Sequence, residues 1–183
     1  MTDIADRYRR LAARFTTVVD AVPDDRWTSP SPCEGWSAAE VVAHVADTQA
    51  ELVDRLGLGP TPEPLPPTPA DRWSAVRDVV QRLLDDPTTS EHRYEGYLGP
   101  TTFGETIDRF YAFDLVVHAW DLARATGLAS LEQIDPAEVD RVRADAEGMG
   151  DALRMEGICG QEVEVATDAT AQERLLAFLG RTP

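Results

Sequence analysis

Apolar residues recur at three- and four-residue intervals along most of this chain, a spacing typical of amphipathic helices. Strict alternation, the mark of a half-buried strand, is confined to EVEV at 162–165, a weak strand candidate. A short last helix is expected near the end of the chain, capped by Asp168. The remaining apolar patterns predict helices over 3–22, 37–56, 70–84, 110–127 and 135–154. The helix that contains 110–127 is expected to start near Gly104 or Glu105. The sequence therefore predicts an all-α protein.

Several predicted helices are bounded by residues that start or stop a helix. Ser37 followed by Glu40 is the capping-box pattern, in which each side chain satisfies the other residue's backbone amide. Gly127 follows the central predicted helix and is suited to the left-handed conformation that ends a helix. Asp135 before Pro136 combines a capping carboxylate with a proline at the first helical position. These signals support the helix boundaries independently of the apolar spacing.

A proline-rich connection, GLGPTPEPLPPTP at 57–69, separates the second predicted helix from the third. Its prolines exclude regular helix, so we expect a semi-rigid loop that crosses the end of a bundle. We interpret it as a crossover inside a single domain over 1–183, because candidate metal ligands lie on both sides of it. An irregular segment is expected over 87–103, with Tyr94 and Tyr97 covering one end of the bundle. The expected architecture is four main helices, not simply up-down-up-down, with a short C-terminal helical addition.

The central predicted helix carries three polar residues on one face of an apolar pattern. Asp114, His118 and Asp121 are four and three residues apart, which brings their side chains to one side of a helix. Phe110 and Val117 lie on or beside that side, so we expect it to point inward. A buried charge is costly unless it is paired or coordinates a metal. Two interpretations remain: a paired core with His118 held between the aspartates, or a metal site.

A second histidine lies in a similar setting. His44 falls in the middle of a predicted helix between two valines, where a lone histidine is more often a satisfied core residue. Together with Asp114 and His118, it completes a set of nitrogen and oxygen ligands, and the combination favours the metal interpretation. The third histidine, His92, lies among charged residues and is expected at the surface.

The charge of the chain excludes some classes of partner. The net charge is −16 with only 17 Lys and Arg, which makes nucleic acid and anionic membrane surfaces poor partners. No apolar run reaches the roughly 18 residues that a membrane span needs. The start of the chain, MTDIADRYRR, lacks the apolar core of a signal peptide. We therefore expect a cytoplasmic protein.

The two cysteines, Cys33 and Cys159, are far apart and have no CxxC spacing. In an intracellular setting we expect both to be reduced, ordinary cysteines. An alternative is left open for Cys33, because it comes just before a helix start, where a thiol can be acidified.

Three segments resemble the mycothiol-dependent maleylpyruvate isomerase-like proteins of the DinB-like superfamily of metal-binding four-helix bundles. They are PCEGWSAAEVVAHVAD, FDLVVHAWDLARATG and LLAFLGRTP. The resemblance covers essentially the whole chain and implies that a divalent metal is held by His44, Asp114 and His118. Zinc is the first expectation, with nickel and iron as alternatives. The isomerases usually have Glu where this chain has Asp114, and they carry a distinct C-terminal domain that is absent or reduced here.

The resemblance also implies a reaction. A metal with three protein ligands keeps an open position, and there it would activate a low-molecular-weight thiol such as mycothiol for S-transfer or isomerisation. Asp121 would orient His118 or a metal-bound water. Trp36 and Trp120 are expected to be packing residues, with a wall of the substrate pocket as the alternative. The expected partners are a small-molecule substrate and this thiol.

Two other functions stay open at the level of sequence. In one, the metal cross-links two helices without catalysis, so that its removal lowers stability only. In the other, a metal-bound hydroxide hydrolyses a substrate. A homodimer formed through the outer faces of the bundle is also left open, because no decisive apolar patch is visible in the sequence.

Overall fold

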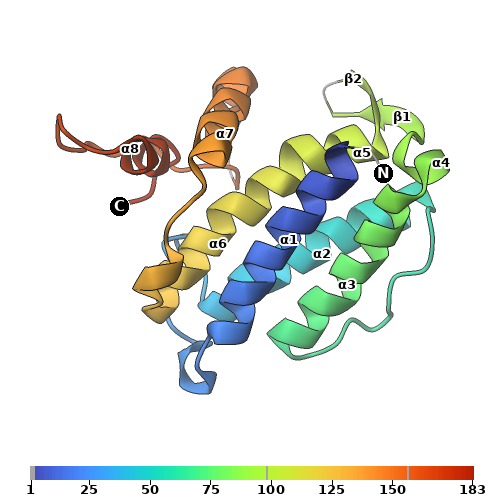
Figure 1. The fold of residues 1–183 in the computed structure, drawn as a ribbon, viewed down its shortest axis with the longest axis horizontal. Coiled ribbons are helices and arrows are strands. Elements are labelled where there is room, and N and C mark those ends of the chain that lie inside the picture. The colour runs from blue at the N-terminus through green and yellow to red at the C-terminus, as the bar shows by residue number, and fades with distance from the viewer. Residues whose placement is uncertain (1–2, 98, 156) are drawn as a thin grey trace.

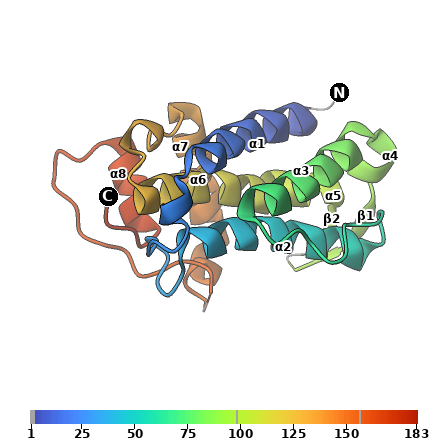
Figure 2. The ribbon, with the colours of Figure 1, turned by 90° about the horizontal axis from the view of Figure 1, so that it is seen from below.

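The computed structural model describes residues 3–97, 99–155 and 157–183. Four long helices form a bundle: α1 (Asp3–Ala21), α2 (Ala38–Leu56), α3 (Pro69–Asp85) and α6 (Ala112–Thr126) (Figure 1). Both α1 and α2 pack against α3 and α6, so α1 and α2 lie diagonally across the bundle. The proline-rich loop between α2 and α3 runs back along the bundle, and these two helices therefore point in the same direction (Figures 1 and 2). The predicted all-α bundle with a long crossover is confirmed.

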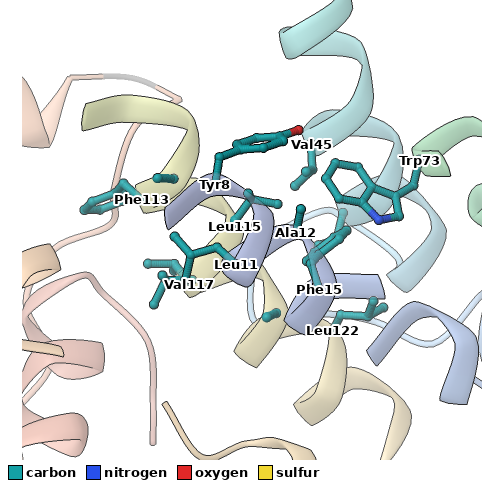
Figure 3. Close-up of a cluster of buried hydrophobic side chains, with 14 of the residues drawn as sticks. Tyr8, Leu11, Ala12, Phe15, Val45, Trp73, Phe113, Leu115, Val117 and Leu122 are labelled. Atoms are coloured by element: carbon teal, nitrogen blue, oxygen red, sulfur yellow. The ribbon is translucent and has the colours of Figure 1, made fainter. Parts of the chain in front are cut away.

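The bundle closes around one continuous apolar cluster, part of which is drawn in Figure 3. The rings of Phe15 and Trp73 meet edge to face at 5.0 Å between centroids, a favoured aromatic arrangement. The two large polar-tipped aromatics are satisfied inside this core. Tyr8 donates to Gln49 at 2.7 Å, and the Trp73 indole donates to Thr16 at 2.9 Å. The core therefore holds α1, α2 and α3 together without a buried unpaired donor at these positions.

The predicted helix ends are largely confirmed. Ser37 and Glu40 form a complete capping box at the start of α2, and Gly127 ends α6 with a φ of 75°. Asp135 caps α7 (Pro136–Met149) by accepting a hydrogen bond from the backbone amide of Ala137. The prediction of Asp168 as the last cap is wrong. Thr170 caps α8 (Ala171–Phe178) through a capping box with Glu173, so the same pattern that located α2 was present and was missed.

The segment predicted to be irregular over 87–103 is more ordered than expected. It holds a short helix α4 (Pro87–Ser90) and a hairpin of β1 (Arg93–Gly96) and β2 (Gly99–Thr102). The strands pair antiparallel with Gly96 opposite Gly99. Tyr94 hydrogen-bonds Thr106 at 2.6 Å, whereas Tyr97 is 82% exposed and does not cover the bundle. The strand candidate EVEV is irregular instead.

The central helix starts within two residues of the predicted start near Gly104 or Glu105, but it is not uniform. A helical turn α5 (Phe103–Thr106) leads into a π-helical stretch η2 (Ile107–Tyr111), which continues into α6. The buried Arg7 supports this stretch by donating to both the carbonyl and the carboxylate of Asp108, at 2.7 and 2.9 Å. A π-helical insertion shifts the face that the preceding residues present, and such insertions are frequent at functional sites.

The C-terminal part packs beside the bundle, with α7 against α6 and α8 (Figures 1 and 2). The predicted 135–154 helix is interrupted: α7 ends at Met149 and a 3-10 turn, η4 (Gly150–Arg154), follows. Two other 3-10 turns are η1 (Asp24–Arg26) and η3 (Ala129–Leu131). Gly180, at a φ of 83°, lies so close to Gly160 that a Cβ would stand 2.7 Å from its Cα. This contact holds the chain end against the 160 region. In the part of the chain that the structure describes, no helix is long and apolar enough to cross a membrane.

Candidate metal centre

The structure brings together the three side chains that the sequence singled out. His44 comes from α2, and Asp114 and His118 come from successive turns of α6. One ligand atom of each lies within 4.8 Å of the other two. Nε2 of His44 is 3.7 Å from a carboxylate oxygen of Asp114. Ligand atoms around a tetrahedral zinc stand about 3.3 Å apart, given bonds of about 2.0 Å. Small side-chain movements would therefore close the group around an ion.

These three side chains differ in burial. His118 is 8% exposed, whereas the side chains of His44 and Asp114 are 28% and 27% exposed. They line a cleft of about 1240 Å³. Among the described residues, the recorded polar partner of the Asp114 carboxylate is His44. No arginine of the described part of the chain forms an ion pair with this carboxylate, so the group has a negative charge available for a cation.

His118 is held in place by Asp121, which is one of the two roles that the family resemblance implied for this residue. Nδ1 of His118 donates to the Asp121 carboxylate at 2.9 Å. This bond leaves Nε2 of His118 as the nitrogen available to a ligand, and a carboxylate behind a histidine is the usual companion of a metal-binding imidazole. The paired-core interpretation placed His118 between two aspartates. In the structure, the hydrogen bond goes to Asp121, and Asp114 faces His44 instead.

The Asp121 carboxylate is fully buried and is neutralised by an arginine from the chain end. Arg181 donates to both carboxylate oxygens, at 2.9 and 3.2 Å. Burial alone would raise the pKa of Asp121, but the hydrogen bond from His118 and the charge of Arg181 outweigh it and lower the pKa to about 2. Burial would likewise lower the pKa of Arg181, and the Asp121 carboxylate raises it instead. Asp121 and Arg181 are therefore a buried ion pair behind His118.

Cys33 lies beside His118, Asp121 and Arg181, but its thiol is not acidified. Its thiol donates to Asp121 at 3.3 Å and lies 3.9 Å from Nδ1 of His118, and Arg181 donates to its sulfur at 3.4 Å. Burial, followed by the charge of Asp121, raises the pKa of Cys33 to about 12. The alternative of an acidified Cys33 thiol is therefore wrong. Burial also raises the pKa of Cys159, in line with two ordinary cysteines.

Among the described residues, two overlapping groups could hold a cation, because the ligand atoms of Cys33, His118 and Asp121 also lie within 4.8 Å of one another. That second group already contains the positive charge of Arg181, hydrogen-bonded to both Asp121 and Cys33. A metal ion there would have to displace a buried guanidinium. The chemistry of the donor set therefore favours the group that contains His44 and Asp114.

Trp36 belongs to the site, and Trp120 to the core. The Trp36 ring lies 4.7 Å from the His44 ring and 6.0 Å from the His118 ring, centroid to centroid, and it lines the cleft. The prediction of a packing role is incomplete for Trp36, which also forms a wall of the cleft. Trp120 is 1% exposed and packs in the core as predicted. His92 is partly exposed and lies outside the cleft.

Tyr111 adds a hydroxyl group to the same cleft, one helical turn before Asp114. Burial, and then the charge of Asp114, raises the pKa of Tyr111 to about 12. The phenol is therefore protonated near neutral pH and is a hydrogen-bond donor. Sequence reasoning did not select Tyr111, because a tyrosine beside Phe110 reads as part of the apolar pattern. The π-helical stretch that ends at Tyr111 is visible only in the structure.

Arg181 was also missed as a site residue. It falls in LLAFLGRTP, a segment that resembles the isomerase-like family, but it lies 60 residues from Asp121 and 148 from Cys33. The signal available in the sequence was Gly180, directly before Arg181. A glycine is needed at this position, because the backbone has a positive φ and passes close to Gly160.

Comparison with protein families supports the resemblance. Residues 8–82 match the family described as the mycothiol maleylpyruvate isomerase N-terminal domain, and the resemblance is thereby confirmed. The matched segment runs from α1 into α3 and contains His44. It ends before Asp114 and His118, so the family match by itself does not cover the α6 half of the candidate metal centre.

The chain is also similar over almost its full length to two proteins from Mycobacterium tuberculosis. These are the uncharacterized protein MT0763 of strain CDC 1551 and the uncharacterized protein Rv0738 of strain H37Rv. Each is 27% identical over 178 residues, which is 96% of either chain. No solved structure matches this chain. The comparisons therefore show that residues 8–82 resemble the mycothiol maleylpyruvate isomerase N-terminal domain and that relatives of nearly the same length exist.

Proposed function

We propose that this protein binds a divalent metal, zinc in the first instance, through His44, Asp114 and His118, and uses it for thiol-dependent S-transfer or isomerisation. The observation that carries the proposal is the approach of these three ligands at a cleft, with His118 oriented by Asp121. A metal with three protein ligands would lower the pKa of a thiol that binds its open position, and so supply a nucleophile at neutral pH.

The protein's own residues would position this chemistry. Asp121 and Arg181 hold the His118 imidazole in one tautomer and one orientation. The Trp36 ring lies beside both histidine rings and would form an aromatic wall next to the metal. The Tyr111 phenol, protonated near neutral pH, would donate a hydrogen bond to a ligand in the cleft. In an S-transfer, the thiol loses its proton, its sulfur bonds to carbon, and the leaving group departs with the electron pair of the bond that breaks.

The proposal is tested by metal content and thiol binding together. Elemental analysis of protein purified without a metal-binding tag should give about one metal per chain, and near zero for the His44→Ala/His118→Ala variant. His92→Ala is the matched control, since His92 lies outside the cleft, and it should keep its metal. The cobalt-substituted protein is then titrated with mycothiol and with N-acetylcysteine. A new thiolate-to-cobalt absorption band is expected.

Each other outcome removes part of the proposal. Metal without any thiol band would exclude the thiol role and leave hydrolysis or a structural metal. Absence of metal from wild type, with the double variant equally folded by circular dichroism and equally stable, would reduce the three residues to a polar cluster. Loss of metal in His92→Ala as well would show that binding is not specific to the cleft.

A further inference from the structure

Most of the large apolar side chains that are exposed in the described part of the chain line the cleft beside the candidate metal centre. Among the described residues, four large apolar side chains are exposed: Tyr97, Met155, Ile158 and Val165. Three of them, all except Val165, line this one cleft. They are 82%, 50% and 54% exposed, respectively. In a chain with a net charge of −16, such a gathering marks a binding surface rather than chance exposure.

Two segments far apart in sequence form this apolar rim, which we define as Tyr97, Met155 and Ile158. Tyr97 lies in the turn of the β1–β2 hairpin, and the other two follow η4. The Tyr97 hydroxyl is 3.8 Å from the Met155 sulfur, so the hairpin and the C-terminal part meet at the rim. Neither segment buries these side chains in the core, which closes without them.

The apolar surface continues from the rim toward the metal ligands. Tyr111, Phe113 and Val117 line the cleft from η2 and α6, and Trp36 lines it beside His44. Pockets for one drug-sized ligand are usually about 300–1000 Å³ and mostly apolar. At about 1240 Å³, this cleft has room for a thiol and a second ligand together.

We propose that the second ligand of this cleft is a bulky, apolar organic molecule of aromatic size, seated on Tyr97, Met155 and Ile158. The inference rests on the proposed function, in which this molecule is the electrophile that the thiol attacks. A small dicarboxylate would reach the polar end of the cleft and leave the apolar rim in water. A second protein chain would favour a flat apolar face, whereas these side chains line a hollow that leads to His44 and His118.

The test uses Nile red, a neutral apolar dye, in fluorescence titrations of the full chain with and without zinc. The Met155→Ser/Ile158→Ser variant and the Tyr97→Ser variant should each bind the dye at least about 10-fold more weakly, since one apolar contact is worth about that factor or more. Val165→Ser is the matched control, because Val165 is exposed but lies outside the cleft. It should bind within about twofold of wild type. Naphthalene should displace the dye, and maleate should not.

Several results would overturn the inference. Equal losses in Val165→Ser and the rim variants would show non-specific adsorption, and unchanged binding in the rim variants would place the dye elsewhere. Displacement by maleate but not by naphthalene would indicate an acidic ligand. A dimer that only the rim variants dissociate, detected by light scattering, would identify a second copy as the occupant. Dye binding to metal-free protein reports on the rim alone, whereas the cobalt band reports on the metal centre, so either proposal can fail separately.

Discussion

His118 lies between two groups of polar side chains that use similar residues and differ in how their charge is balanced. On one side, Asp121 is fully buried and is neutralised by Arg181, with Cys33 hydrogen-bonded to both. On the other, Asp114 is partly exposed at the cleft and faces His44, with no arginine paired to it among the described residues. We call Cys33, Asp121 and Arg181 the closed group, and His44 and Asp114 the open group. The closed group already contains a positive charge, and the open group lacks one.

The comparison teaches that residue type alone does not identify a metal site. Cys33, His118 and Asp121 are a chemically reasonable ligand set, and their ligand atoms, like those of the other three residues, lie within 4.8 Å of one another. The position of one guanidinium decides between the two sets, because a buried carboxylate already paired with an arginine has little to gain from a metal ion. The predictions below test this division, from the largest expected effect to the smallest.

Replacing Arg181 should have the largest effect. Arg181→Met would leave Asp121 charged and buried without its main partner, which should cost about 3–5 kcal/mol of unfolding free energy. Arg124→Met is the matched control, because Arg124 is 42% exposed and lies 3.4 Å from Glu132. It should cost about 1 kcal/mol or less. Urea denaturation of metal-free protein measures both, and equal losses would contradict the assignment of a buried ion pair.

Acid should weaken the closed group in a defined pH range. The pKa of Asp121 is lowered to about 2 in the folded protein, below the value near 4 of an unfolded chain. The unfolded state therefore takes up the proton first as the pH falls, and the stabilisation that is present above about pH 5 is lost toward pH 2. The loss should be about 2–3 kcal/mol. The stability gap between wild type and Asp121→Asn, measured by urea denaturation at each pH, should narrow over this range. A constant gap would contradict the lowered pKa.

Asp121→Asn should also weaken the open group through His118. The amide keeps the shape of the carboxylate but loses the charge that orients and polarises the imidazole. We expect zinc affinity to fall about 10- to 100-fold, measured by competition with a chelating dye. Asp47→Asn is a suitable control, because Asp47 of α2 pairs with Arg72 of α3 and neither residue lines the cleft. A change in affinity of similar size in the control would remove the special role of Asp121.

Cys33 should matter least. Cys33→Ser should leave metal stoichiometry and affinity unchanged within about twofold, because the open group does not use the thiol. In a Cys159→Ser background, iodoacetamide should modify folded Cys33 far more slowly than it modifies N-acetylcysteine at pH 8, since a pKa of about 12 leaves almost no thiolate. Loss of metal in Cys33→Ser would contradict this assignment and show that the metal binds in the closed group.

Much of the fold could be predicted from local patterns. Apolar spacing located the ends of the four bundle helices to within two residues. The capping box of Ser37 and Glu40 marked the start of α2 correctly, and Gly127 marked the end of α6. The misses have local causes as well. Thr170 with Glu173 is a capping box that was overlooked. The hairpin was overlooked because its strands are only four residues long.

For the candidate site, the sequence predicted some residues and missed others. The sequence singled out His44, Asp114 and His118, because polar residues within apolar helical patterns are conspicuous, and the structure shows them close together. Their role as metal ligands stays a prediction, as do the single domain, the cytoplasmic location and the oligomeric state. Helical spacing put Asp121 on the same face as His118, the family resemblance implied that it orients His118 or a metal-bound water, and its hydrogen bond to His118 agrees with the first of these roles.

By itself, the sequence determined the features that depend on spacing along one helix: the bundle helices, most of their caps, and the pairing of Asp114 and His118 on one face. Only the tertiary structure decided the features that depend on contacts between distant segments. Arg181 reaches Asp121 across 60 residues, and Tyr97 meets Met155 across 58. Helical periodicity is a local geometric rule that a sequence displays directly. The approach of two segments depends on how the whole core closes, and no short pattern records it.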